Sequence, residues 1–544
     1  MTQATDEPDT RRSAGIVGLA VIASRLFGLV RDTVFAAMFG AGELLDAYIA
    51  AFRIPNMLRD LFAEGALSTA LTALFTRTYD KEGPAPAWRL ANLTLTAMIF
   101  LIGLVCVAAI AAAPWIVQAT SPGFHSVPGK FELAVNLTRL LFPFILFVSL
   151  AAAVMGMLNA RFVFGIPASA STVFNIVSVV AGVAAAFLFD PSARATWPHP
   201  VFTVRSLYGV SFGVLLGGLA QLGMQLPALG RLGFRFEWRL ALGDPRLKEL
   251  WALMWPSLIA GATVQVNVLV NSIFASEING AQGWLTFAFR LMQLPIGLFG
   301  VSLATATLPA VARRFARDDL GAFGRTVRTS LRLVLFFCLP SAIGLAVLAQ
   351  PIIGLIYQHG HFNSAATEQT ALALQAYAVG LAGYAAIKVL TPCFYALGQP
   401  RTPFRVSLIG MALNFGLNLL NARVLHFGHA GLALTTSLVA IINFAQLSAA
   451  LGRKIDFGRP LEWLGFMARV GTATAVCGAV AWLAQTGLDT FVHSGLLRGA
   501  GLALVIGAAA AAYFGATHVL KVTETAEAIA LVRRRLMRKR APAA

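Results

Sequence analysis

Arginines and carboxylates interrupt the first two apolar stretches of the chain, which are long enough to cross a lipid bilayer. They are Arg25, Arg31 and Asp32 in the first stretch, and Asp46, Arg53, Arg59 and Asp60 in the second. Charge inside a bilayer is costly, so such groups usually face a cavity or a partner and mark a functional site. Guanidinium groups hold phosphate oxygens through paired hydrogen bonds. The pattern therefore predicts a hydrated cavity that captures a phosphate-bearing ligand.

Spacing along these stretches suggests which charges pair with one another. Asp46, Arg53 and Asp60 recur every seven residues and would share one face of an unbroken helix. One interpretation is internal ion pairing, in which Arg53 binds Asp60 and Arg31 binds either Asp32 or Asp46. Under that interpretation these residues are structural and do not contact a ligand.

Arg25, Arg59 and Arg290 have no acid at an ideal helical spacing. Arg59 has Asn56 as a neighbour three residues earlier. Arg290 lies alone in the eighth apolar stretch, where it either faces a cavity or extends to the cytoplasmic surface. A buried cation needs an anion or water beside it. We predict that the three arginines converge on one hydrated cavity, with Arg31 near its rim.

Composition places the chain in a membrane. It has 544 residues, of which 58% are hydrophobic and 12% charged, whereas about a quarter of the residues in a soluble protein are charged. Repeated apolar runs of roughly 18 residues or more indicate spanning helices, because backbone groups in lipid must bond internally. The four cysteines have neither metal nor redox spacing, and no P-loop or nucleophile motif is found. A membrane transporter without a bound cofactor is favoured over an enzyme.

The predicted fold is an all-α polytopic membrane protein of about 14 transmembrane helices. Pro55 is expected to break the second span, because proline cannot donate to the helical ladder. The predicted spans cover residues 14–38, 44–76, 90–115, 132–158, 164–189, 206–229, 248–275, 283–309, 327–349, 368–396, 404–423, 430–451, 461–486 and 496–519.

Lysine and arginine predict the orientation of these spans. With the first residues inside, the inner loops and the tail hold about 28 of them and the outer loops four: Lys130, Arg194, Arg205 and Arg423. Both termini are therefore expected in the cytoplasm. The net charge of +18 is mainly a topology signal and not a sign of nucleic-acid binding. The basic tail is expected to lie against anionic lipid headgroups, with RNA binding as the alternative.

The basic loop after the sixth span divides the first twelve spans into two sets of six. Two such lobes around a central cavity are a common transporter plan. The predicted divisions are an N-lobe at 1–230, a C-lobe at 231–455, two extra helices at 456–520 and a basic tail at 521–544.

Two sequence motifs resemble those of the MurJ/MviN family of lipid II flippases. The first comprises residues 24–32 (SRLFGLVRD), 46–48 (DAY), 55–59 (PNMLR) and 63–68 (AEGALS), and the second is 290–301 (RLMQLPIGLFGV). The span count also matches, so the resemblance covers essentially the whole chain. It implies the fold of the multidrug/oligosaccharidyl-lipid/polysaccharide exporter superfamily, in which the last two helices form a groove for the lipid tail.

The resemblance also implies the site. Family arginines that line the central cavity correspond to Arg25, Arg31, Arg59 and Arg290. Four polar residues of the same motif complete the candidate substrate-binding set: Ser24, Asp46, Asn56 and Glu64.

This sequence departs from the family pattern at two places. Family members often carry an acid just before the eighth-span arginine, where this chain has Phe289. Some members hold sodium at positions that correspond to Asn271, Asn414, Asn418 and Thr435, which supply no carboxylate here. Sodium coupling is therefore not expected, and these four residues are only weak candidates for a cation site.

The expected function is transport of lipid II, the undecaprenyl-pyrophosphate-linked peptidoglycan precursor, across the bacterial inner membrane for cell-wall synthesis. Alternating access would carry the polar head, with the membrane potential as the driving force and a single chain as the transporter. The alternative is a multidrug or polysaccharide-lipid exporter of the same superfamily. A cationic-drug exporter should present acids in its cavity, whereas the candidates here are net basic. A membrane transferase would need paired carboxylates or a histidine, and no such cluster is found.

Overall fold

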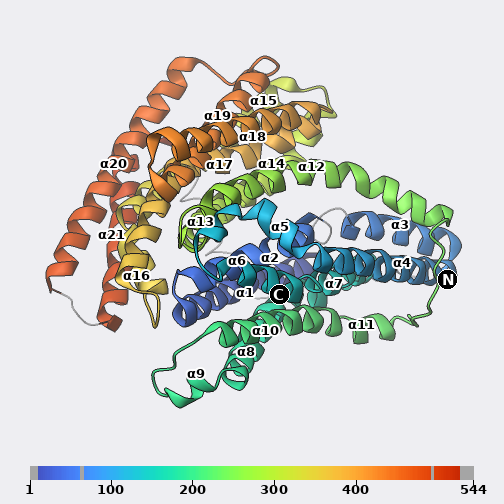
Figure 1. Ribbon diagram of the computed structural model, residues 1–544. Helices are drawn as coiled ribbons and strands as arrows, with labels where there is room; N and C mark the ends of the chain where they lie inside the picture. The colour runs from blue at the N-terminus through green and yellow to red at the C-terminus, as the bar shows by residue number, and fades with distance from the viewer. Residues whose placement is uncertain (1–9, 62–66, 492–494, 527–544) are drawn as a thin grey trace, which may run out of the picture. The chain divides into compact units, whose positions relative to one another are not determined.

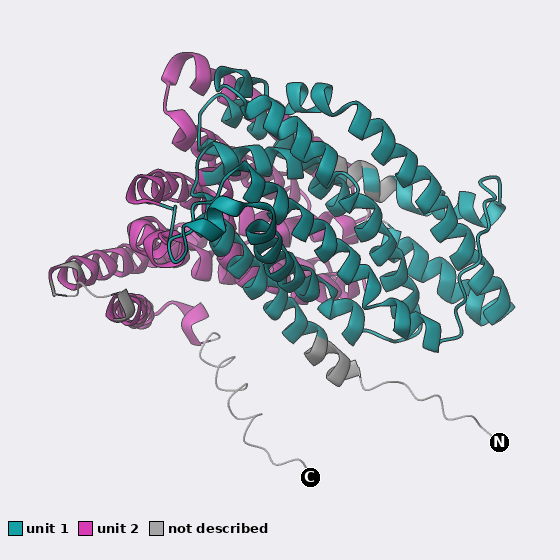
Figure 2. Cartoon of the chain, turned by 60° about the horizontal axis from the view of Figure 1, so that its bottom comes forward, with its two compact units in different colours: residues 1–283, 360–362 teal, residues 284–359, 363–544 magenta. Residues whose placement is uncertain are grey.

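The computed structural model describes residues 10–61, 67–491 and 495–526, and these residues form helices joined by turns and loops, without a β-strand. Figure 1 shows the order of the helices along the chain. The chain divides into two compact units (Figure 2). Unit 1 comprises Met1–Gly283 with Gly360–Phe362, and unit 2 comprises Trp284–His359 with Asn363–Ala544. These units are defined by contacts, and the lobe boundaries expected from the sequence stay a prediction.

Unit 1 contains the charged first helices and the segments that pack around them. Its helices are α1 (Thr10–Phe39), α2 (Glu43–Leu61), α3 (Leu67–Glu82), α4 (Pro84–Ala111), α5 (Ala113–Thr120), the short 3₁₀ helix η2 (Pro122–Ser126), α6 (Lys130–Leu141), α7 (Phe144–Ala160), α8 (Gly165–Phe189), α9 (Pro191–Ala195), α10 (Val204–Gly223), α11 (Leu226–Arg231) and α12 (Pro245–Ser276).

Unit 2 begins within the first turn of α13 and continues to the end of the described chain. Its helices are α13 (Ala281–Pro295), the π-helical η3 (Ile296–Val301), α14 (Ser302–Phe315), α15 (Leu320–Val347), α16 (Ala349–Tyr357), α17 (Ser364–Ala396), α18 (Arg401–Leu420), the π-helical η4 (Asn421–Leu425), α19 (Gly428–Gly452), α20 (Pro460–Phe491) and α21 (Gly495–Val519).

Eleven stretches of the described chain are long and apolar enough to cross a membrane. The remaining three predicted spans coincide with α1, with α2 and α3 together, and with α12. The expectation that Pro55 breaks the second span is wrong, because α2 continues through Pro55 to Leu61. A proline costs a helix one backbone hydrogen bond, and in membrane helices neighbouring groups compensate for that loss.

Small residues allow close backbone approach inside each unit. A Cβ added to Gly213 of α10 would lie 2.3 Å from the Cα of Gly182 on α8. In unit 2, a Cβ on Gly380 of α17 would lie 2.6 Å from the Cα of Ser437 on α19. Helices in lipid associate through such packing because burial of apolar surface gives them little driving force there. The glycines therefore set the spacing of the helices that support the charged residues.

The last two helices, α20 and α21, pack against α15 within unit 2. Their shared core includes Phe336, Val470 and Tyr513, and the Tyr513 hydroxyl donates to the Phe336 carbonyl at 2.5 Å. Other side chains of these helices, among them Leu464, Trp482 and Leu504, are exposed. An apolar exposed face is what lipid contact requires.

Candidate functional site

Arg25 lies on α1 with its side chain exposed. Within the described part of the chain it makes no ion pair. The preceding residue, Ser24, is half-buried, and its carbonyl accepts a hydrogen bond from the Asn175 side chain of α8 at 3.2 Å. Because the Arg25 side chain is exposed while its helix is packed against α8, its guanidinium is accessible to an anion.

Arg31 lies about two turns further along α1 and pairs with its neighbour Asp32. Its Nε and Nη2 donate to one Asp32 oxygen at 3.2 and 2.9 Å, and its guanidinium lies 5.7 Å from the centre of the Phe174 ring. Of the two expected partners, Asp32 is therefore the one found, and Asp46 is engaged elsewhere. Both side chains of the pair are largely buried.

The end of α2 carries a second pair, between Arg59 and Asp60. Two Arg59 nitrogens donate to one Asp60 oxygen at 3.1 and 2.7 Å. The expectation that Arg59 lacks a carboxylate partner is wrong, and so is the pairing of Arg53 with Asp60. Arg53 instead donates to the Gln282 side chain at 2.7 Å. A flexible arginine can reach the adjacent residue, a geometry that rules based on helical spacing do not cover.

Asp46, near the start of α2, is completely buried and belongs to a network that the sequence did not reveal. Its carboxylate accepts from Lys130 Nζ at 2.8 Å and from the backbone N–H groups of Gly280 and Gly283 at 2.7 and 3.0 Å. Lys130 also donates to Asn279 at 2.8 Å and lies 4.5 Å from the centre of the Phe124 ring. Both Asp46 oxygens therefore already have partners within the protein.

Lys130 is the residue that sequence reasoning missed. The charge count places it in an outer loop, yet its side chain is only 1% exposed. The available signal was its place at the start of an apolar helix, close to a span boundary. Its partner is 84 residues earlier in the chain, so no local pattern links the two.

The other candidates are less fully characterised by the structure. Asn56 is half-buried on α2, and Glu64 lies outside the described residues. Arg290 is half-buried on α13 and belongs to unit 2, whereas Arg25 and Arg59 belong to unit 1. Convergence of these three arginines on one cavity stays a prediction.

The four weak cation-site candidates are distributed over both units. Asn271 is half-buried on α12 in unit 1, while Asn414 and Asn418 on α18 and Thr435 on α19 are buried in unit 2. Among the described residues, no group of three or more His, Cys, Asp or Glu side chains could hold a metal ion. Neutral oxygens alone compensate a desolvated cation poorly.

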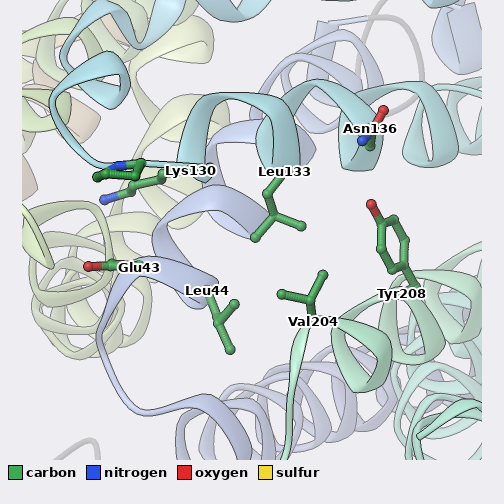
Figure 3. A pocket seen from close by; sticks show the side chains of 9 residues that line it. Glu43, Leu44, Lys130, Leu133, Asn136, Val204 and Tyr208 are labelled. Carbon is green, nitrogen blue, oxygen red and sulfur yellow. The ribbon is translucent and has the colours of Figure 1, made fainter.

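A pocket of about 340 Å³ lies in unit 1 where α2, α6 and α10 begin. Figure 3 shows Glu43 and Lys130 on one side of it, and Asn136 and Tyr208 on the other. Lys130 is one of the lining residues, but its side chain is almost entirely covered by protein.

Comparison with known proteins identifies close relatives. The profile of the family described as "Lipid II flippase MurJ" matches residues 35–500. A probable lipid II flippase MurJ of Vibrio cholerae serotype O1 is 32% identical over 523 residues, which cover 94% of this chain and 96% of that protein. The lipid II flippase MurJ of Burkholderia cenocepacia is 32% identical over 467 residues, or 85% and 87% of the two chains.

Two solved structures show a similar fold. A lipid II flippase MurJ in an inward closed conformation superposes with a TM-score of 0.75 at 24% identity, covering 92% of this chain and 98% of that one. An inward-facing multidrug resistance transporter of the MATE family gives a TM-score of 0.65 at 15% identity, with coverage of 79% and 96%.

Proposed function

The chain belongs to the MurJ family of lipid II flippases, and on that premise we propose that it carries lipid II from the cytoplasmic to the periplasmic leaflet. The observation that carries this proposal is a family match over nearly the whole chain. The protein is accordingly a multi-pass protein of the bacterial inner membrane. Likeness to the multidrug transporter extends to the fold alone and does not favour drug export.

We propose that the exposed and half-exposed arginines bind the pyrophosphate of the substrate. Arg25 is open to a ligand, and the Arg59–Asp60 pair is 24% and 31% exposed. A pair of this exposure is worth only about 0–1 kcal/mol, so a pyrophosphate, which carries about one negative charge on each of its two phosphates, can compete with Asp60 for the guanidinium. Arg290 on α13 would add a third contact from unit 2, and Arg31 would remain near the rim with Asp32.

Transport by this route needs no nucleotide and no chemical step, and a single chain suffices for it. The head would occupy a hydrated cavity while the tail stays in lipid, along the exposed apolar side chains of α20 and α21. An interior-negative potential favours outward movement of an anion by about 2.3 kcal/mol per charge per 100 mV. The membrane potential is therefore the proposed driving force.

Depletion of the protein tests the proposed function directly. If it is the flippase, lipid II accumulates on the inner leaflet and incorporation of new peptidoglycan stops. Continued appearance of lipid II on the outer leaflet, with the protein gone, would contradict the proposal. A depletion strain rescued by the intact gene is the control.

The membrane orientation that we propose can be tested separately. Both termini are expected in the cytoplasm, so the exposed Ser126 should lie outside and the exposed Ala316 inside. A cysteine at Ser126 should react with an impermeant maleimide in intact cells, and one at Ala316 only after permeabilisation. The reverse labelling would overturn the span assignment.

A further inference from the structure

The ion pair between Asp46 and Lys130 is sealed from solvent on both sides, with side chains 0% and 1% exposed. Other ion pairs of the described residues, such as Arg59–Asp60 and Arg77–Glu249, keep partly exposed side chains. Burial of two charges is costly and is tolerated only when both are well bonded. The arrangement around this pair accordingly satisfies both partners.

The pair fixes one short turn of the chain, residues 277–283. Asp46 accepts from the N–H groups of Gly280 and Gly283, and Lys130 binds the Asn279 side-chain oxygen. The Asn279 amide nitrogen in turn donates to Glu43 at 3.3 Å. Asp46 lies on α2 and Lys130 begins α6, so one turn is attached to two helices through a single buried network.

This turn occupies a special place in the chain. It follows α12 and enters α13, and the chain passes from unit 1 to unit 2 immediately after Gly283. Helix α13 also carries Arg290. The attachment of the turn therefore fixes the start of α13, the helix that carries Arg290.

Lys130 supplies the charge that makes this attachment possible. Without it, the Asp46 carboxylate would be buried with only two backbone N–H groups for compensation. A buried carboxylate in that situation draws in water, takes up a proton or moves out. The lysine is therefore required as the charged partner of Asp46.

We propose that Lys130 is a positioning residue for transport, which holds the turn 277–283 against α2 and α6 and is loosened when this end of the protein opens. The proposal rests on the alternating-access transport proposed above. If the units move relative to each other during transport, this segment, one of three places where the chain passes between them, would be held in one state and released in another. In the held state Asp46 and Lys130 are bonded to each other, and in the released state water would solvate both charges.

The attachment of the turn can be measured by how readily a reagent reaches the residue that lies beneath it. Ala41 is buried, and a Cβ on Gly283 would lie 3.4 Å from its methyl group. Ala41→Cys is introduced after the four native cysteines have been replaced, and its reaction with a maleimide is followed in purified protein in detergent. In detergent both ends of the protein are accessible, so the result does not depend on the membrane orientation.

Lys130→Met should raise the labelling rate about tenfold or more. The Asp46 carboxylate would then be buried without a counter-charge, which is strongly unfavourable, so the turn would lose its attachment. Glu132→Gln is the matched control. It removes an exposed carboxylate from the same end of α6 but leaves the pair and the turn intact, so labelling should stay at the parent rate. A cysteine at the buried Ala193 in α9, away from the turn, should react slowly in all variants.

A double variant separates loss of attachment from misfolding. Asp46→Asn with Lys130→Met removes both charges and the penalty of an unpaired one. If the ion pair holds the turn, labelling at position 41 stays fast while position 193 stays protected. Return of labelling to the parent rate in the double variant would overturn the proposal, as would fast labelling at position 193.

Transport of lipid II is measured in the same variants. Lys130→Met should lower delivery to the outer leaflet, and normal delivery together with fast labelling would overturn the role in transport. If the parent protein itself moves no lipid II, the proposed function fails, whereas the labelling comparison still decides whether Lys130 holds the turn.

Discussion

The two ends of α2 carry ion pairs of the same chemistry in opposite surroundings. Near its start, Asp46 and Lys130 lie 2.8 Å apart with 0% and 1% of their side chains exposed. At its end, Arg59 and Asp60 lie 2.7 Å apart with 24% and 31% exposed. Charges attract far more weakly where water raises the local dielectric constant. We infer that the first pair anchors the structure and that the second stays available for exchange with another anion.

The sealed pair should give the largest effect on stability. Asp46→Asn leaves the Lys130 ammonium buried without a carboxylate, so the free energy of unfolding should fall by about 3–5 kcal/mol. Unfolding of purified protein in detergent measures it. Glu43→Gln, on the same helix but exposed, should have little effect. Equal losses in both variants would show that the loss does not come from the buried pair.

A third carboxylate gives an intermediate case. Asp190 is buried at the end of α8 and accepts hydrogen bonds from the Thr203 and Ser206 hydroxyls at 2.7 and 2.6 Å, and from Ser192. Because its donors are neutral, Asp190→Asn should cost less than Asp46→Asn, about 1–3 kcal/mol. The same unfolding measurement ranks the two variants, and a larger loss for Asp190→Asn would contradict this order.

Asp190 also predicts a pH dependence. Burial alone would raise the pKa of this carboxyl, but the hydrogen bonds from Ser192, Ser206 and Thr203 outweigh it, and the pKa lies below its ordinary value. The stabilisation is therefore complete above the unfolded pKa of about 3.9 and is lost as the pH falls through the folded pKa. The difference in stability between parent and Asp190→Asn should shrink in acid. A difference that grows in acid would mean that folding raises the pKa of Asp190 instead of lowering it.

The half-exposed pair should have the smallest effect on stability. Arg59→Ala should change the free energy of unfolding by no more than about 1 kcal/mol, even if transport is lost. Asp60→Asn is the matched control, because it breaks the same pair and keeps the arginine. Strong destabilisation by Arg59→Ala would make this pair a structural anchor like the one at the other end of α2.

Sodium should have no effect on transport. Asn414 and Asn418 are buried without a carboxylate at the corresponding family positions, and a desolvated cation needs a compensating charge. Delivery of lipid II should persist when potassium replaces sodium and collapse when the membrane potential is dissipated. Strict dependence on sodium would contradict this expectation.

Much of the fold followed from the sequence because long apolar runs and the arginine-rich first helices are local patterns. The Arg31–Asp32 pair was also within reach, since its partners are adjacent. The Asp46–Lys130 pair was not, because it joins α2 to α6 across 84 residues, and only tertiary packing brings them together. The continuation of α2 through Pro55 likewise depends on packing around the helix.

The central claim is that reachable arginines bind the substrate, and delivery of lipid II to the outer leaflet tests it most directly. Cells depleted of the parent protein are supplied with Arg25→Ala, Arg59→Ala or Arg290→Ala at native protein levels, together with each Arg→Lys variant. Each alanine variant should lower delivery by about tenfold or more, and lysine, which keeps the charge but loses the paired hydrogen bonds, should fall in between. Normal delivery in all three alanine variants would contradict the account.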